Sequence, residues 1–508
     1  MRRGLRVGLA RVGIGSALII LMSQVSGAAA PRMVQLPDKS PLVTIRLVFT
    51  TGAASDPAAK YGAAHLTSLM LSQGGTRGMT YRQIVDAMYP MATSVHAYSD
   101  KEMTTFIGET HVDNLDKFYG LMRDMILNPG WRADDFSRLK DDAINELRVS
   151  LRGNNDEDLA KEEMYNLIYA ASPSGAVHPY GHADLGTASA LDAMTIADLQ
   201  SFYKNHYTQA NLIIGLAGGY PAAFAERVKR DFSALPEGAA DRFDLPAPAP
   251  IEKNRATLIE KDTRSVAWSF GFPIDVKRGD PDFAALSVMQ SWLGQHRSEN
   301  RLYDRIREIR GMNYGDYAYI EYFPRGMFRF EPEPNLARHQ QIFQIWIRPV
   351  EPQNAAFSLR LALYELDRLV KNGMSQEDFE RTRSFLGKYV NVLTKTKSAE
   401  LGYAIDSAYY GIPNYNAYMK AALAKLTLED VNRAIRKHLR SENLQIVGVA
   451  KDTAALEAQL TNGEPTPVHY NSAKPQDIVE EDKVVEKWPL RLKREDVSVV
   501  PVDQVFER

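Results

Sequence analysis

The sequence predicts an α+β protein built from two homologous halves, each a mainly antiparallel sheet packed with helices. Short segments of alternating apolar and polar residues, typical of strands, are mixed with longer segments whose apolar residues recur three and four apart, typical of helices. The order of these segments does not follow a strict strand–helix–strand alternation. A Pro- and Ala-rich stretch divides the chain near its middle, and a helix-to-strand segment recurs on both sides of it.

The composition is that of a globular protein. The chain has 508 residues, of which 44% are hydrophobic and 24% charged, and chains pack about 150 residues into each domain. The net charge of -2 gives no support to nucleic-acid binding, which usually shows a basic excess. The absence of cysteine excludes disulfides, cysteine nucleophiles and thiolate zinc sites.

Residues 1–30 have the pattern of a signal peptide. Four arginines among the first eleven residues precede an apolar run from Val12 to Met22, and small residues follow at 26–30. A stable membrane span needs about 20 apolar residues, so we expect export to a bacterial periplasm rather than a span. The cleavage position stays open, and an uncleaved anchor is the alternative.

The predicted first half comprises residues 31–234. Its apolar residues switch between a period of two and a period near 3.6. Strands are expected at 43–50, 103–110 and 211–217, and helices at about 61–73, from 112, from about 134 past 148, and after a capping box that begins at Thr195.

Residues 235–253 form the predicted linker, with alternating Pro and Ala between Leu245 and Pro250. The second half, residues 254–461, repeats the pattern, with strands expected at 266–272 and 342–347 and helices at 283–292, after Ser375 and after Thr427. The C-terminal tail, residues 462–508, is mixed in charge. We expect its apolar segment, 497–502, to form a strap over the second half.

The repeated segment supports a duplication. Thr195, Asp198 and Asn211 in the first half match Thr427, Asp430 and Asn443 in the second, each pair 232 residues apart. Both copies place a capped helix before an apolar strand. A repeat of this length indicates two homologous halves.

One predicted helix, from Tyr61 to the glycines at 74 and 75, contains a single histidine. A zinc peptidase of the inverted type has His-x-x-Glu-His on such a helix, because the metal needs three protein ligands and its water needs a base. This chain has His65, Ser68 and Leu69 at those positions. Leu69 cannot bind zinc, and Ser68 cannot act as a general base. Taken alone, His65 reads best as an ordinary structural histidine.

A second candidate ligand, Glu146, lies on the side of a predicted helix that carries Leu139 and Ala143. It is either a remnant ligand or a glutamate at the edge of a buried face with its carboxylate in water. The pair His178 and His182 has metal-like spacing, but Pro179 and Gly181 favour a loop.

The segment Gly62-x-x-His65-x-x-x-x-Met70, followed by Gly74-Gly75-Thr76, resembles the inverted zinc helix of the pitrilysin/insulinase family, which includes mitochondrial processing peptidase. The spacing to Glu146, the loop at 178–181 and the duplication also resemble this family, over residues 40 to 460. The resemblance implies two halves that close like a clamshell around a peptide. It marks His65 and Glu146 as remnants, with the metal function lost at Ser68 and Leu69.

Another segment, Arg307-Glu308-Ile309-Arg310-Gly311-Met312-Asn313-Tyr314, resembles the family's Arg-Glu-x-x-Gly-Leu-x-Tyr segment. In that family the Arg and Tyr come from the half opposite the zinc, so the resemblance implies that Arg307 and Tyr314 bind substrate. A guanidinium and a phenol can both donate to a developing oxyanion. The alternative is a solvated arginine and a core tyrosine.

Retained Arg307 and Tyr314 beside a lost zinc motif resemble the non-catalytic subunit of two-subunit family members. We therefore expect a chain that is inactive alone, holds no cofactor, and pairs with an active zinc-peptidase subunit of the same family, which carries the zinc. The expected substrate is a peptide or unfolded polypeptide. Two alternatives stay open, an active zinc endopeptidase with an unusual metal set and a non-enzymatic scaffold or peptide-binding protein.

Overall fold

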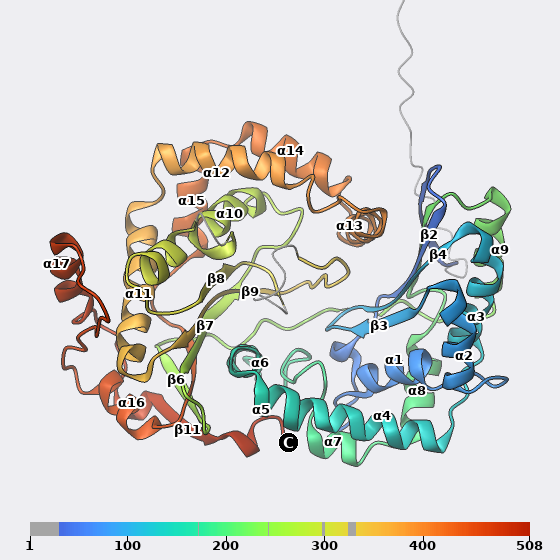
Figure 1. The fold of residues 1–508 in the computed structure, drawn as a ribbon, viewed down its shortest axis with the longest axis horizontal. Coiled ribbons are helices and arrows are strands. Elements are labelled where there is room, and N and C mark those ends of the chain that lie inside the picture. The colour runs from blue at the N-terminus through green and yellow to red at the C-terminus, as the bar shows by residue number, and fades with distance from the viewer. Residues whose placement is uncertain (1–29, 171, 242, 297–299, 324–331, 508) are drawn as a thin grey trace, which may run out of the picture.

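The computed structural model describes residues 30–507 except 171, 242, 297–299 and 324–331. The predicted signal peptide lies outside these residues, apart from Ala30. Two sheets with helices around them lie side by side along the long axis of the molecule (Figure 1). The predicted α+β class and the clamshell of two halves are therefore confirmed. No helix of the described part is long and apolar enough to cross a bilayer.

The first sheet has five strands in the order β1-β5-β2-β4-β3. Only β1 and β5 pair in parallel, and the other neighbours are antiparallel. The strands are β1 (Arg32–Pro37), β2 (Leu42–Phe49), β3 (Val95–Ser99), β4 (Thr104–His111) and β5 (Leu212–Gly218). The three strands that the apolar pattern predicts are present, whereas β1 and β3, which form the two edges, were missed.

The helices of the first half lie mainly on one face of this sheet. They are α1 (Ala63–Gln73), α2 (Tyr81–Met88), α3 (Leu115–Leu127), α4 (Ala133–Asn145), α5 (Arg152–Asn154), α6 (Asp156–Ile168), α7 (Ala188–Asp192), α8 (Ile196–His206) and α9 (Ala222–Phe232). The predicted capping box at Thr195 begins α8. The helix expected from 134 past 148 is α-helical only to Asn145 and continues as a π-helical segment, Glu146–Leu151.

The second sheet has six strands in the order β11-β6-β10-β7-β9-β8. They are β6 (Arg255–Glu260), β7 (Val266–Ile274), β8 (Gly315–Tyr319), β9 (Gln341–Val350), β10 (Gln445–Ala450) and β11 (Val497–Pro501). The tail thus contributes a strand to this sheet. The segment that was expected to form a strap over the second half instead joins the second sheet as its edge strand β11, and the chain then runs on to the first half.

The helices of the second half are α10 (Phe283–Gln290), α11 (Ala355–Asn372), α12 (Gln376–Tyr389), α13 (Lys397–Tyr410), α14 (Tyr415–Lys425), α15 (Leu428–His438), α16 (Thr453–Thr461) and α17 (Gln476–Val485). Two π-helical segments, Ser291–Gln295 and Tyr303–Glu308, follow α10. The predicted caps at Ser375 and Thr427 both accept a backbone N–H, and Thr427 forms a full capping box.

The two halves repeat one topology. In the first sheet, β5 lies between β1, to which it is parallel, and β2, to which it is antiparallel. In the second sheet, β10 lies in the same way between β6 and β7. The orders β1-β5-β2-β4-β3 and β6-β10-β7-β9-β8 are equivalent. The duplication read from the two capped helices therefore extends to the whole sheet, and β11 is an addition to it.

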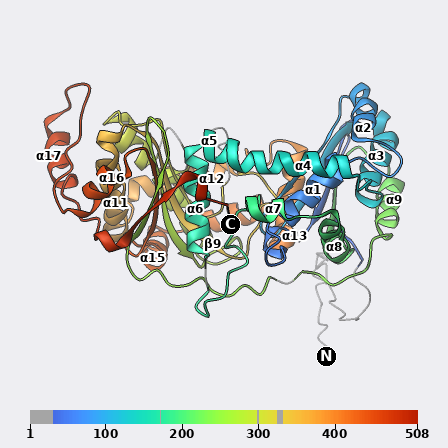
Figure 2. The ribbon, with the colours of Figure 1, turned by 90° about the horizontal axis from the view of Figure 1, so that it is seen from below.

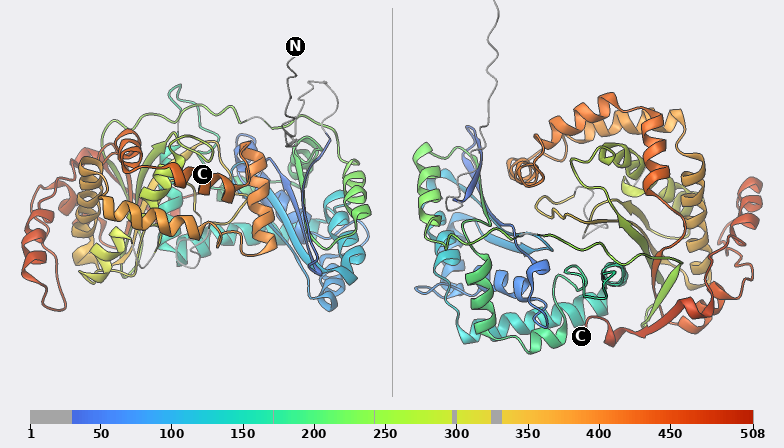
Figure 3. Two further views of the ribbon diagram at one scale, coloured as in Figure 1. Left: turned by 90° about the horizontal axis from the view of Figure 1, so that it is seen from above. Right: turned by 180° about the vertical axis from the view of Figure 1, so that it is seen from behind.

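Each half also lends one helix to the other sheet. Helix α6 of the first half packs on β7 and β10, and α13 of the second half packs on β5, β1 and β2. The views from below and from above show both helices between the two sheets (Figures 2 and 3). Leu401 and Ile405 of α13 are fully buried against Ile213 of β5. This exchange joins the halves into one body.

Polar side chains meet where the halves join, and Arg338 lies at their centre with no exposed surface. Its Nε donates to Asp100 at 3.0 Å and its Nη2 to Asp184 at 3.2 Å, while its guanidinium lies 3.5 Å from the centre of the Tyr322 ring. Lys101, also buried, pairs with Asp184 at 2.8 Å. Burial of charge at this depth is tolerable only because every charge has an opposite partner.

The second half holds a half-buried histidine, His296. Its Nδ1 lies 2.9 Å from Ser291 Oγ, and its ring meets Phe385 and Tyr389 edge-on. Burial lowers the pKa of His296 to about 4 from its ordinary 6.5. The folded state therefore favours the neutral imidazole of His296.

The first prediction concerns the junction. Arg338→Met leaves Asp100 buried without its guanidinium, so the free energy of unfolding should fall by about 3–5 kcal/mol. Urea denaturation measures it. The matched control is Arg82→Met, which removes an exposed pair with Asp86 and should change stability by less than about 1 kcal/mol. Equal effects of the two changes would contradict a junction held by buried charge.

The second prediction concerns pH. Between pH 6.5 and about 4, the unfolded state binds a proton at His296 that the folded state refuses. Stability is therefore intact above pH 6.5 and should fall by on the order of 2–3 kcal/mol as the pH drops to about 4. His296→Phe keeps a ring but removes this slope, whereas the exposed His96→Phe should keep it. Urea titrations at several pH values test both, and an unchanged slope in His296→Phe would refute the assignment.

Candidate functional site

Helix α1 carries the first group of candidate residues. It begins at Gly62, which has a φ of 97° and no room for a Cβ, because that atom would lie 2.8 Å from the carbonyl oxygen of Leu185. The carboxylate of Asp56 accepts the N–H groups of Gly62 at 2.6 Å and Ala64 at 2.8 Å. An acid at this end also complements the helix dipole.

His65 lies half-buried on α1. Burial lowers its pKa, and the charges of Asp56, Asp184 and Glu146 oppose that shift. Glu146 is thus one of the three carboxylates whose charge acts on His65. Glu146 itself is exposed, while Leu139 and Ala143 on its helix are buried. It begins the π-helical segment Glu146–Leu151, a type of segment that is often found at functional sites.

The residues at the other two zinc positions serve the core. The Ser68 hydroxyl is buried and donates to the carbonyl of His65 at 2.7 Å. Leu69 is half-buried and packs against the hydrophobic core of the first half. A catalytic zinc ion needs three protein ligands, and α1 with Glu146 supplies two donors. In the part of the chain that the structure describes, no group of three His, Asp or Glu side chains is placed to hold a metal. The donor set does not fit a catalytic zinc.

The second group, Arg307 and Tyr314, lies on the other half. Arg307 is in the π-helical segment Tyr303–Glu308, and its guanidinium lies 4.8 Å from the Tyr303 ring centre and 4.9 Å from that of Tyr314. Such stacking on two rings holds a cation in place. The Tyr314 side chain is 54% exposed, so it is not a core tyrosine. The structure therefore brings these two residues together and leaves both within reach of a ligand.

The turn between them depends on Gly311, whose φ is 69°. Its N–H donates to the carbonyl of Arg307 at 2.7 Å and closes the segment. Beyond Tyr314, Asp316 is buried, and burial raises its pKa well above the usual range although the Asn313 amide and the Arg307 charge act against this. Asp316 thus favours its neutral form beside Arg307, while the carboxylate of the neighbouring Glu308 lies 3.3 Å from the guanidinium.

The two groups of candidate residues lie on different halves of the chain. α1 and α4 lie beside the first sheet, β8 lies at the edge of the second, and α6 lies between them (Figure 1). Arg307 and Tyr314, which precede β8, therefore belong to the second half, whereas α1 belongs to the first.

The remaining histidine pair lies in a loop, as expected. His178 is buried, its Nε2 lies 2.9 Å from the carbonyl oxygen of Pro246, and its Nδ1 accepts the N–H of Tyr180 at 3.0 Å. His182 stacks on Tyr61 and lies 3.3 Å from Asp56. Both therefore support the loops around α1.

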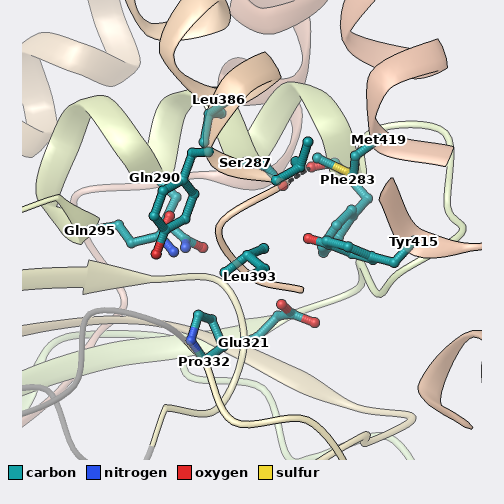
Figure 4. Close-up of a pocket in the computed structure, with 12 residues that line it drawn as sticks. Phe283, Ser287, Gln290, Gln295, Glu321, Pro332, Leu386, Leu393, Tyr415 and Met419 are labelled. Atoms are coloured by element: carbon teal, nitrogen blue, oxygen red, sulfur yellow. Dashed lines mark hydrogen bonds between the residues drawn. The ribbon is translucent and has the colours of Figure 1, made fainter. Parts of the chain in front are cut away.

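A cavity of about 40 Å³ lies in the second half, between α10, α12 and α14 (Figure 4). Glu321, Gln290 and Tyr415 point into it among apolar side chains. It has room for one or a few water molecules. None of the candidate residues lines it, so it is a packing defect rather than a substrate site.

Comparisons with known proteins agree with the resemblance. The model of the insulinase family, peptidase family M16, matches residues 32–174, and that of the M16 inactive domain matches residues 193–386. The two matches together span more than half of the chain. The chain belongs to the M16 family of zinc peptidases and their homologues.

Some relatives are named as zinc proteases and others as non-peptidase or inactive proteins. An uncharacterized zinc protease of Mycobacterium bovis is 24% identical over 431 residues, 82% of this chain and 92% of the relative. A non-peptidase homolog from Helicobacter pylori is 20% identical over 83% of this chain and 92% of the relative. The crystal structure of a peptidase M16 inactive domain from Pseudomonas fluorescens matches with a TM-score of 0.72 at 23% identity, over 84% of this chain and 96% of that chain.

The reasoning from sequence alone missed some residues that shape the site. The run Asp100-Lys101-Glu102 between β3 and β4 reads as a solvated turn, yet all three residues are buried. In the sequence, the burial of these residues is indicated only by three consecutive charged residues directly before an apolar strand. Asp56, the cap of α1, lies too far from the helix in sequence for a capping pattern.

The third prediction concerns the metal. Ser68→Glu with Leu69→His restores the inverted motif on a helix that the structure keeps intact, with Glu146 as the third ligand. The double variant should bind about one zinc per chain, and the parent chain should bind far less. Metal analysis after gel filtration measures both. Ser68→Glu alone is the control, because it adds a base but no second histidine. Stoichiometric zinc in the parent chain would contradict the loss of the site.

Proposed function

We propose that this chain is an exported, catalytically inactive M16 homologue that pairs with an active zinc-bearing chain of the same family. It helps to enclose a peptide or unfolded polypeptide and contributes Arg307 and Tyr314. The zinc and its base come from the partner. The signal-peptide pattern of residues 1–30 supports a periplasmic location.

The proposal rests on a difference between two groups of residues: the zinc-motif positions on α1 have changed, whereas the Arg307–Tyr314 pair is present. On α1 the base position is a buried serine bonded to its own helix, and the second histidine position is a half-buried leucine that packs against the core. Arg307 and Tyr314, in contrast, are stacked together and accessible on the other half. An oxyanion-binding pair without its own metal is useful only if another chain brings the metal.

The edge of the first sheet supports peptide binding. β3 pairs with β4 on one side only, and α1 packs directly against it. An exposed strand edge can accept an extended peptide as an additional strand. Directly before β3, Tyr89, Pro90 and Ser94 line a surface hollow, in which Tyr89 is 83% exposed. This hollow offers a place for a side chain of such a peptide.

The fourth prediction tests the pair. In the complex co-purified from the native envelope, Arg307→Ala and Tyr314→Phe should each lower the kcat of peptide cleavage about 100-fold, the usual cost of losing one oxyanion donor. Tyr314→Phe keeps the ring on Arg307 and removes only the hydroxyl. Arg436→Ala, on an exposed pair with Glu429, is the control and should leave cleavage unchanged.

Three outcomes would contradict the proposal. Unchanged cleavage in both variants would make the chain a scaffold. Cleavage by the isolated chain with bound zinc would make it an active peptidase. Isolation of the chain from the envelope without any zinc-bearing relative would exclude the pairing.

A further inference from the structure

The tail, residues 462–507, lies outside both ranges that the family models match. It runs through α17 on the outer side of the second half, returns as β11 in the second sheet, and ends between the halves near α5 and α7 (Figures 1 and 2). One segment therefore touches both halves of the molecule. The tail is held at two places, which we call the first and the second anchor, and these lie beside the two groups of candidate residues.

The first anchor holds the segment that carries Arg307. Arg310, whose side chain has no exposed surface, donates from Nε to Asp482 at 2.9 Å and from Nη2 to Glu481 at 2.8 Å. Arg305 pairs with the same Glu481. The tail thus binds the arginines that flank Arg307 on both sides.

Two further contacts complete this anchor. The Lys474 ammonium donates to the carbonyl of Ile309 at 2.8 Å, and the Tyr470 hydroxyl donates to Asp482 at 2.5 Å. The Ile309 carbonyl lies at the end of the π-helical segment, where helical carbonyls lack partners within the helix. The tail therefore satisfies the end of the helix as well as its charges.

The second anchor holds the segment that begins at Glu146. The Glu507 carboxylate accepts from Arg148 at 2.8 Å and from Arg152 at 2.9 Å. The backbone N–H of Ala188 donates to the carbonyl of Phe506 at 2.9 Å. Phe506 is buried in the core of the first half. These bonds fix residues 506 and 507 of the tail to the π-helical segment Glu146–Leu151, to α5 and to α7.

We propose that the tail is a brace that positions the Arg307–Tyr314 segment relative to the Glu146 helix. Both segments are π-helical, a geometry that is rarely stable without support from its surroundings. The tail supplies buried ion pairs to one and a carboxylate with an apolar anchor to the other. Between the two anchors, β11 pairs in parallel with β6, and this pairing holds the connecting chain against the second sheet. The catalytic importance of the brace rests on the proposed function, but its mechanical role does not.

The chain has no cysteine, so Val149→Cys and Asp304→Cys create two unique labelling sites, both exposed, one on each braced segment. Spin labels on this doubly substituted chain should give one narrow distance distribution. Adding Glu481→Gln with Asp482→Asn should widen it, and amides of residues 303–314 should exchange hydrogen about tenfold faster. Glu480→Gln is the matched control, because it changes an exposed carboxylate on the same helix.

Milder variants keep the test decisive if the double change prevents folding. Lys474→Ala removes one contact at the first anchor, and Glu507→Gln weakens two at the second. Each should widen the distance distribution relative to Glu480→Gln. Unchanged distances and exchange in these folded variants would overturn the brace. Widened distances with undiminished peptide cleavage by the co-purified complex would support the brace and reject the role of Arg307 and Tyr314 instead.

Discussion

The pairing of Arg338 with Asp100 and Asp184 is the constraint on which the arrangement of the halves depends. A guanidinium keeps its proton in proteins, so its burial between the halves requires carboxylates at fixed places. Asp100 stands at the turn between β3 and β4, and Asp184 lies in the loop before α7. These are the loops beside the edge strand and the former zinc helix. The charge of one residue from the second half therefore sets where the candidate peptide edge lies relative to the second sheet.

Local patterns of the sequence predicted the elements that depend on local physics. The strand β2 and the capping boxes at Thr195 and Thr427 each appear where expected. The alternation in β2 predicted a half-buried strand, but both of its faces are buried because α13 of the second half also packs against it. Edge strands β1 and β3 were missed because they are short and only partly buried. The exchange of α6 and α13 and the sixth strand of the second sheet escaped prediction because they arise from contacts between residues far apart in the chain. The same holds for the π-helical segments, whose shape is imposed by their neighbours.

For the candidate site, the resemblance of their segment to the family singled out Arg307 and Tyr314, and only the structure shows that they contact each other. Their accessibility could not be read from the sequence. Helix α1 shows that the fold does not depend on which residues stand at the zinc-motif positions. Leu66 and Met70 bury one face of α1 completely, Asp56 caps its start, and Ser68 satisfies its hydroxyl within the helix. The stability of α1 thus depends on packing and capping, and neither requires a metal.

The tail adds a strand and ion pairs to the second half that the first half does not have. Five strands already complete the repeated topology, so β11 adds an edge strand that the duplicated fold does not need. The segment that leads to it carries acids that pair with the buried Arg305 and Arg310. Arg305 also pairs with Glu365 of α11 at 2.9 Å, whereas Arg310 pairs with Glu481 and Asp482 of the tail, and its burial depends on them. The arginines and the acids therefore depend on each other, whereas Arg307 between them makes its ring contacts with Tyr303 and Tyr314 and stays partly exposed. The tail therefore fixes the two neighbours of Arg307 and leaves Arg307 itself accessible, as the proposed contact with a peptide substrate requires.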